Sequence, residues 1–307
     1  MNPAAEILLI WQRELRRSFR SVKGILLTVF AVLGGFGVTM LAYWLFTIFI
    51  ADKIAGTGVT YGSPEWQELK RKGFEEVLGV EQGGFFAQMP EALFAMFQIT
   101  VWLTPLLVAL MSFDAISAEM QHRSLRYWSV RCRKESLFLG KAFGQWSVVA
   151  IVWLILDLVV VIVTVARGQA PLGTCLLYAV RLWLFTLPTA LVWSAWATLV
   201  SSAFKSPPLA LFSILGLFFV LFVLRSVGDI WAAFQVAQEV KDAIAKGVEN
   251  PVPTKHIRPL AYLYPNEYSD LMLSVRAGEF MKGLLPCLAY AAALLGLGSW
   301  SFRRREV

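Results

Sequence analysis

The chain has 307 residues, of which 57% are hydrophobic and 16% are charged, and its mean hydropathy is +0.61. An ordinary soluble domain has about a quarter of its residues charged, so the composition excludes that class of protein. The net charge of +7 would suit a nucleic-acid partner, but the basic residues cluster beside apolar runs, and we expect no nucleic acid to bind.

The first 23 residues predict an amphipathic helix that lies on a membrane surface. Ile7, Trp11 and Leu15 recur at four-residue spacing, while arginines such as Arg13 and Arg17 occupy the other side. A basic helix of this kind lies in the headgroup region and is attracted by anionic lipid. A cytosolic helix packed on another domain is the alternative. Direct continuation into an apolar stretch favours the interfacial position.

Residues 24–307 predict a transmembrane domain with six spans. A span needs about 20 apolar residues, because a hydrocarbon core of ~30 Å is crossed at ~1.5 Å per residue. Backbone groups in hydrocarbon must be hydrogen-bonded within the segment, so the spans are predicted to be helices and the fold to be all-α. The six stretches are 24–50, 91–112, 142–166, 175–199, 209–228 and 283–302.

Short helices are also predicted in the loops before the second and the sixth span. Ser63 can cap a helix that begins at Pro64. In the later loop, the stripe from Ile230 to Ile244 predicts one helix, and Asn266 can cap another. These helices are too short and polar to span, so we expect them to lie at the outer face or to dip partly into the membrane.

The distribution of basic residues predicts that both termini are cytoplasmic. With this orientation, the cytoplasmic segments carry 15 lysines and arginines in 66 residues, and the outer segments carry 11 in 102. Loops on the cytoplasmic side of membrane proteins carry this excess of positive charge. We therefore expect a multi-pass protein of the cell membrane, with the bacterial cytoplasmic membrane as the best candidate.

Two opposite charges, Asp157 and Arg181, fall inside the third and fourth spans. The loop between these spans is short, so the two helices should be antiparallel neighbours and the side chains could form an intramembrane ion pair. An unpaired charge near a helix centre costs roughly 2.5–3.5 kcal/mol, which favours pairing. Such a pair is either a structural lock or a polar site on a transport path, and we favour the lock.

The segment between the second and third spans carries the clearest functional pattern. In order, it contains Asp114, Glu119, Ser124-Leu125, Arg131, Arg133 and Gly140-Lys141. This order resembles the loop of the type-2 ATP-binding-cassette (ABC) export permeases, although Arg123 replaces the family's glycine and the basic stretch lacks its proline. The resemblance extends to the amphipathic N-terminal helix, the six spans, the Tyr264-Pro265…Tyr268 element and the terminal aromatic and basic cluster.

The resemblance implies that residues 114–130 form a coupling helix that docks on a separate ATPase subunit. It also implies two ABC ATPase subunits and a second permease copy, in a homodimer or a close heterodimer, and a smaller contact at residues 201–208. The implied ATPase-coupling residues are Asp114, Glu119, His122, Arg123, Ser124 and Leu125.

The chain does not itself contain a nucleotide-binding loop. A G-x-x-x-x-G-K-[ST] motif ending at Gly140-Lys141 would need glycine at Glu135 and serine or threonine at Ala142. We therefore expect no catalytic residue, metal or cofactor in this chain, with ATP and Mg bound by the partner subunit.

Two other classes of function remain open. An ATPase-independent secondary transporter or channel would favour inverted repeats, and none is convincing. An integral-membrane enzyme or assembly factor would need clustered acidic and histidine side chains, whereas His122 and His256 are predicted on opposite sides. The apolar, tryptophan-rich spans favour export of a hydrophobic or amphipathic cargo, with a possible extracytoplasmic accessory protein at the outer loops.

Overall fold

The computed structural model describes residues 2–45, 63–78, 86–125, 127–128, 132–246, 260–273 and 277–304. These parts of the chain are helical and contain no strand, and six of the helices are long and apolar enough to cross a membrane. The predicted all-α membrane fold is confirmed. The six are α2 (Val22–Leu45), α6 (Glu91–Ser112), α9 (Lys134–Ala166), α10 (Leu172–Ala203), α11 (Pro207–Ala245) and α13 (Ala277–Arg303).

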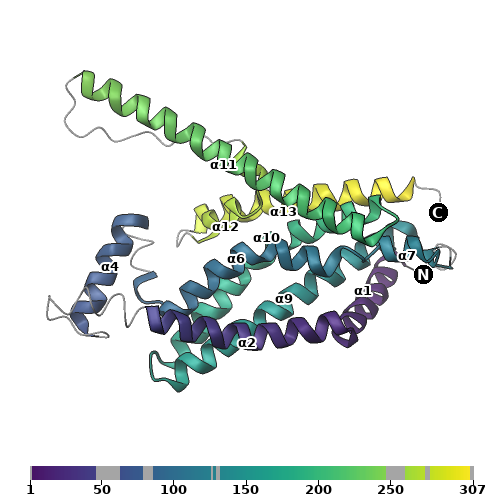
Figure 1. Ribbon diagram of the computed structural model, residues 1–307, viewed down its shortest axis with the longest axis horizontal. Coiled ribbons are helices and arrows are strands. Elements are labelled where there is room, and N and C mark those ends of the chain that lie inside the picture. Colours follow the sequence, from purple (N-terminus) through teal and green to yellow (C-terminus); the bar gives the residue numbers. More distant parts are fainter. Residues whose placement is uncertain are drawn as a thin grey trace.

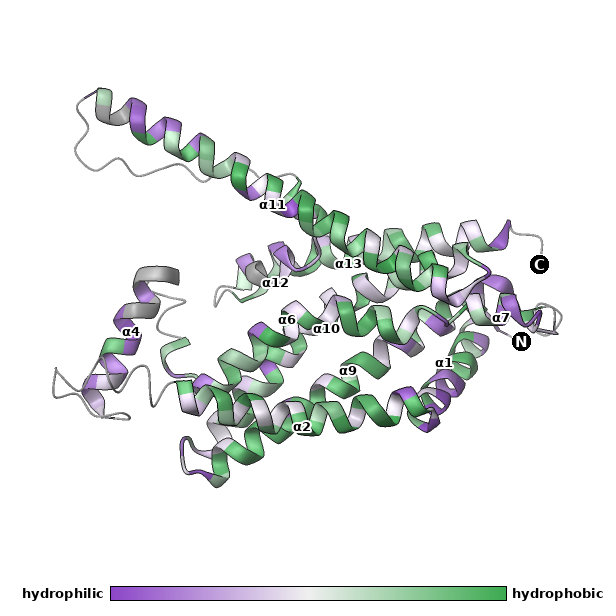
Figure 2. Cartoon of the chain, viewed as in Figure 1, coloured by the Kyte–Doolittle hydropathy of each residue, from purple (hydrophilic) through white to green (hydrophobic). Residues whose placement is uncertain are grey.

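The long helices pack side by side, and shorter helices lie toward both ends of the bundle (Figure 1). One end holds α1 (Pro3–Arg20), α7 (Ser117–Gln121) and the last turn of α13. The other end holds α4 (Pro64–Leu78) and the far part of α11. Figure 2 shows apolar residues along the middle of the bundle and hydrophilic residues toward both ends. This distribution is the one that a membrane-spanning domain requires.

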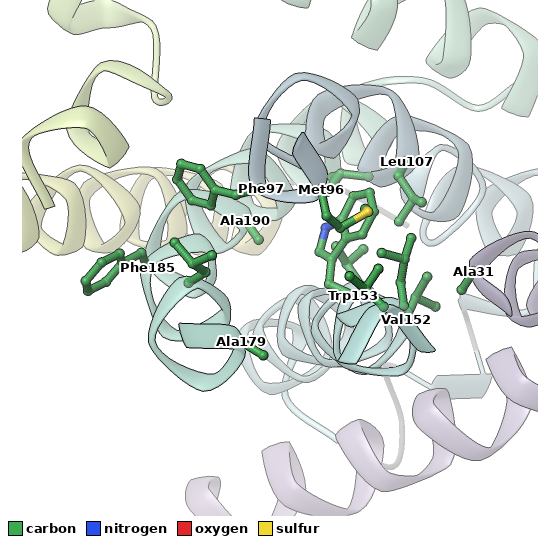
Figure 3. Packing of buried hydrophobic residues seen from close by; sticks show 14 of the residues in the cluster. Ala31, Met96, Phe97, Leu107, Val152, Trp153, Ala179, Phe185 and Ala190 are labelled. Atoms are coloured by element: carbon green, nitrogen blue, oxygen red, sulfur yellow. The ribbon is translucent and has the colours of Figure 1, made fainter. Parts of the chain in front are cut away.

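The core lies where α6, α9 and α10 meet. Trp153 of α9 is fully buried and lies beside Met96 of α6, while the neighbouring Val152 lies toward Leu107 of α6 and Ala31 of α2 (Figure 3). In α9 and in α10, 56% of the most apolar 18-residue stretch is buried inside the protein. In α2 and in α11, the corresponding share is 22%. The outward faces of α2 and α11 are therefore the apolar surfaces that lipid or another chain must cover.

Several helix bounds differ from the predicted spans. The structure begins α9 at Lys134, well before residue 142, and α2 is described only to Leu45, so residues 46–50 lie outside the described part. The separate helix expected from Ile230 to Ile244 is wrong, because α11 continues without a break to Ala245. At about 58 Å, α11 is nearly twice the ~30 Å hydrocarbon core, and its far part projects beyond the bundle.

The segment before α13 packs into the bundle. Helix η2 (Ala261–Leu263) lies against α11, and α12 (Glu267–Met272) packs on α13 and α10. Asn266, which precedes α12, is buried, and its side-chain amide donates to the carbonyl oxygen of Val101 on α6 at 2.8 Å. A side chain of this short segment thus reaches the backbone of a long helix.

Candidate functional site

The start of α7 is held by a serine at the end of α10. The Oγ of Ser201 accepts hydrogen bonds from the backbone N–H groups of Ile116 (3.2 Å) and Ser117 (3.3 Å). The same hydroxyl donates to the carbonyl oxygen of Phe113 at 2.9 Å. The first N–H groups of a helix lack partners within the helix, so this serine satisfies donors that α7 could not satisfy alone. The position of α7 is thereby tied to α10.

A buried lysine joins α7 to two further helices. Lys141 of α9 is 1% exposed, and its Nζ lies 2.8 Å from Glu119 Oε1 of α7 and 3.0 Å from Glu14 Oε1 of α1. Arg17 adds a second cation, with one guanidinium nitrogen 3.7 Å from Glu119 and 4.0 Å from Glu14. Lys141, Glu119, Glu14 and Arg17 form a four-charge cluster with two charges of each sign. Because Lys141 and Arg17 balance the two carboxylates, Glu14 and Glu119 can be buried together with Lys141.

Three members of the cluster, Lys141, Glu14 and Glu119, are removed from water, whereas the Arg17 side chain is 62% exposed. Truncating one partner of a buried ion pair leaves an uncompensated charge and costs about 3–5 kcal/mol. One glutamate oxygen, Glu119 Oε2, is buried and accepts no hydrogen bond within the described residues. The carboxylate of Glu119 therefore depends on Lys141 and Arg17 for most of its stabilisation.

Two glycines allow α1 to approach α9 closely enough for this cluster to form. A Cβ atom on Gly140 would lie 2.7 Å from Ile10 Cβ, and one on Gly144 would lie 2.8 Å from Glu14 Cβ. Residues four apart share one face of a helix, so both glycines face α1. A larger residue at either position would push α1 outward and lengthen the Lys141–Glu14 contact.

The N-terminal end of α1 contacts the start of α9. Glu6 Oε2 accepts a hydrogen bond from the backbone N–H of Arg133, at 3.2 Å. This bond, with a smaller contribution from the Ser136 hydroxyl, holds the pKa of Glu6 below its ordinary value. The positive end of the helix dipole also favours a carboxylate there. Helix α1 is thus attached to α9 at both Glu6 and Glu14.

The predicted coupling residues divide into an exposed group and an inward-facing group. His122 and Arg123 are exposed in the turn after α7, and Arg123 has a left-handed backbone with a φ of 57°. Ser124 is half-buried, and its hydroxyl donates to the carbonyl oxygen of Glu119 at 3.3 Å. Leu125 is buried.

The two acidic residues of the prediction are used inside the chain. Glu119 is 7% exposed and belongs to the four-charge cluster. Asp114 lies 2.6 Å from Lys23 Nζ, at the junction between α1 and α2. Both carboxylates therefore hold the loop to neighbouring helices, and other side chains form the exposed surface of the loop.

Sequence reasoning did not single out several residues of this region. Gln121 is exposed, and Tyr127 is 78% exposed, so both extend the surface formed by His122 and Arg123. We call Gln121, His122, Arg123 and Tyr127 the exposed rim. The role of Glu14 was also missed. The sequence signal for this role is a stripe at every fourth position of α1. The residues that α1 buries are the members of this stripe, Glu6, Ile10, Glu14 and Ser18.

The structure does not join the two charges predicted to pair within the spans. No ion pair within 4 Å connects Asp157 to Arg181 in the described part of the chain, and the Arg181 guanidinium lies over the Phe185 ring, 5.5 Å from its centroid. Asp157 is 8% exposed. Although α9 and α10 are neighbours, as predicted, adjacency alone does not decide which faces of the two helices meet.

A second polar network lies around α12. Trp193 Nε1 donates to Asn266 Oδ1 at 2.8 Å, and Arg225 forms an ion pair with Glu267. The Arg225 guanidinium also lies 5.3 Å from the centroid of the Tyr264 ring. Arg225 therefore fixes the start of α12 to α11.

The fold and this end of the bundle define a multi-pass membrane protein in which one short polar helix is held firmly to three longer ones. Among the residues that the structure describes, no group of His, Cys, Asp and Glu could hold a metal ion. The family model described as "ABC-2 family transporter protein" matches residues 8–307. A comparison with individually curated proteins gives no significant match.

Because the match covers nearly the whole length, the chain belongs to the ABC-2 transporter family. It is a membrane-embedded permease of an ABC transporter, and membership of the family implies an ATPase partner.

Proposed function

We propose that this chain is the permease subunit of an ABC exporter, driven by two separate ABC ATPase subunits through α7 and the exposed rim. ATP and Mg²⁺ would be bound by those subunits, and this chain would supply no catalytic residue. The observation that carries the proposal is the contact of Lys141 with both Glu119 and Glu14. A partner that displaces α7 must then move α1 and α9 with it.

The contacts around α7 suit the transmission of a rigid-body motion. Ser201 ties α7 to α10, Lys141 ties it to α9, and Glu14 extends the connection to α1. Conformational changes in transporters commonly move packed elements as units. A push on one short helix would therefore reach two of the most buried spans directly.

The exposed rim has the composition of a protein-binding surface. Tyrosine and arginine are enriched among residues that dominate binding energy, and Tyr127 and Arg123 are both exposed here. Arg133 is exposed in the same loop and adds positive charge. We expect the groove of the ATPase subunit to present carboxylates and an apolar site for the tyrosine ring. The positive-inside bias of the sequence supports a cytoplasmic position for this surface.

The rest of the transporter is inferred from the outward faces of the bundle. A single chain with sparsely buried α2 and α11 does not enclose a path, so a second permease copy, identical or closely related, would complete it. The apolar spans favour a hydrophobic or amphipathic cargo that moves outward. The projecting end of α11 would be available to an accessory protein on the outer side.

Co-purification tests the proposal. The chain is expressed in its native membrane, and the ATPase that co-purifies with it is quantified by mass spectrometry. Replacing the four rim residues with alanine should reduce the recovered ATPase by about tenfold or more, since such residues dominate interface energies. The matched control is Tyr262→Ala with Arg304→Ala, which removes an exposed tyrosine and an exposed arginine elsewhere.

The control should retain its ATPase, and both variants should elute as single species of the same size. Full recovery of the ATPase with the rim variant would contradict the docking assignment. Transport by the reconstituted chain without any nucleotide-hydrolysing partner would contradict the proposed function as a whole.

A further inference from the structure

An apolar groove lies between α2 and α6. Its cavity volume is about 580 Å³, which is in the range of about 300–1,000 Å³ that is typical of ligand sites. Apart from Lys23 at one end, every lining side chain is apolar. The lining residues are Lys23, Leu26, Leu27, Phe30, Leu103, Leu106, Leu107, Leu110, Met111 and Phe113.

The length of the groove corresponds to one leaflet of a bilayer. Along α6 it runs from Leu103 to Phe113, which is about 15 Å at ~1.5 Å per residue. This distance is half of the ~30 Å hydrocarbon core. The end at Lys23 and Phe113 lies beside α1, where the polar end of the bundle begins (Figure 2). The groove therefore extends from the headgroup level to about the middle of the membrane, as an acyl chain does.

A polar chamber adjoins the headgroup end of the groove. Its volume is about 290 Å³, and it shares Lys23 and Met111 with the apolar groove. The chamber contains two cations, Arg17 and Lys23, and two carboxylates, Glu14 and Asp114. A site with balanced charge suits a headgroup that carries one charge of each sign. The carboxylates would repel a net anion, and Arg17 and Lys23 would repel a net cation.

One buried acceptor oxygen of the chamber receives no hydrogen bond from the described residues. Gln145 is 4% exposed and lines the chamber, and its Oε1 atom is buried and accepts no hydrogen bond from the described residues. Buried acceptors without a partner are uncommon, because each costs free energy. A primary ammonium group carries three N–H donors and could satisfy this oxygen, whereas a quaternary choline ammonium carries none.

We propose that the groove and chamber together bind a phospholipid with a phosphoethanolamine headgroup. One acyl chain lies between α2 and α6, the phosphate lies near Arg17 and Lys23, and the ammonium donates to Gln145 Oε1 and faces Glu14 and Asp114. The site does not depend on ATPase coupling, although its chamber borders the four-charge cluster through Glu14 and Arg17. The bound lipid thus contacts the four-charge cluster, through which the ATPase subunit would act on the spans.

Photo-crosslinking on the full-length chain tests this site. The chain is reconstituted in nanodiscs with a trace of phosphatidylethanolamine that carries a diazirine midway along one acyl chain, and the labelled peptides are mapped by mass spectrometry. Label should concentrate in peptides containing residues 22–30 and 103–113. Unlabelled phosphatidylethanolamine should compete about tenfold better than phosphatidylcholine or phosphatidylglycerol, the change expected from losing one hydrogen bond to a charged group.

Two variants separate the acyl-chain site from the headgroup site. Leu110→Trp places a large ring in the groove and should abolish the concentrated label, while Leu33→Trp, at an exposed position on α2 outside the groove, should leave it unchanged. Gln145→Leu should keep the label but remove the preference for phosphatidylethanolamine. The measurement is confined to protein that elutes as a single species.

Several results would overturn the proposal. Equal competition by the three lipids in the wild-type chain would refute the headgroup assignment, and this measurement needs no variant. Label spread evenly over all lipid-facing helices, or label that survives Leu110→Trp, would refute the groove. Crosslinks from α2 and α6 to a second copy of the chain, in place of lipid label, would show that protein occupies the groove.

Discussion

Lys141 Nζ lies 2.8 Å from Glu119 Oε1, although the two residues belong to different helices and are 22 positions apart. The same ammonium contacts Glu14, so a single side chain links α7, α9 and α1. The glutamate of the family-like loop is therefore an internal anchor, and the exposed rim is a separate set of residues. This separation allows the anchoring and docking roles to be tested independently.

Lys141→Met should strongly destabilise the chain. The substitution removes the main counter-ion of two buried carboxylates, for which we expect a loss of about 3–5 kcal/mol. Replacing all three residues, as Lys141→Met with Glu14→Gln and Glu119→Gln, should recover most of that loss, because neutral buried groups need no counter-ion. Thermal unfolding in detergent measures both effects. If the single variant unfolds at the wild-type temperature, the cluster has no structural role.

Gly140→Ala should weaken the packing of α1 on α9. The added methyl group would lie 2.7 Å from Ile10 Cβ, and overpacking of this kind costs about 1–3 kcal/mol. The matched control is Gly34→Ala on α2, where an added Cβ would meet no other described part of the chain within 4 Å. The control should gain up to about 1 kcal/mol, because alanine favours a helix over glycine. Unfolding temperatures that change equally for both variants would contradict the close approach.

Acid should loosen the attachment of α1 at Glu6. The pKa of this carboxyl is lowered in the folded chain by the Arg133 N–H group, so its stabilisation is present above the ordinary glutamate pKa of about 4.3. The stabilisation is lost as the pH falls from there through the lowered pKa. Hydrogen exchange of α1, followed from pH 6 to pH 3, should show this loss in the wild type and not in Glu6→Gln. Identical pH profiles would exclude the contribution of Glu6.

Hydropathy and charge in the sequence were sufficient to predict the six membrane-crossing helices and the all-α fold. Both signals depend on whether lipid or water surrounds a segment. They are therefore local properties of the sequence, and they predict a span without knowledge of which helices contact one another. The break expected before Ile230 was wrong because a change from apolar to polar residues marks the membrane boundary and does not end a helix. Helix α11 crosses that boundary and continues to Ala245.

Pairing between distant residues was harder to predict. Asp157 and Arg181 have similar depth on neighbouring helices, yet they form no ion pair, because the rotation of each helix about its axis is set by packing of the whole bundle. Lys141 was predicted only as part of the family-like loop, and Glu14 was not singled out. Only the close approach of α1 at Gly140 and Gly144 brings them together.

Arg123→Gly should stabilise the chain while weakening the proposed docking. Arg123 has a φ of 57°, and a left-handed backbone costs a residue with a side chain about 1–2 kcal/mol relative to glycine. Arg123→Ala removes the same charge but keeps most of that cost. Both variants should therefore recover less ATPase, and only the glycine variant should unfold at a higher temperature. A gain in stability with alanine as large as with glycine would argue against backbone strain.

Trp193→Phe should release the segment before α12 from the bundle. The substitution removes the N–H group that donates to Asn266 Oδ1, and a buried acceptor left without its donor costs about 1–3 kcal/mol. Trp153→Phe is the matched control, because Trp153 is as deeply buried but its Nε1 donates no hydrogen bond within the described residues. Hydrogen exchange of residues 260–273 should increase in Trp193→Phe and stay near the wild-type rate in the control. If both variants exchange alike, loss of ring volume explains the effect. If only Trp193→Phe responds, the hydrogen bond to Asn266 holds the segment in place.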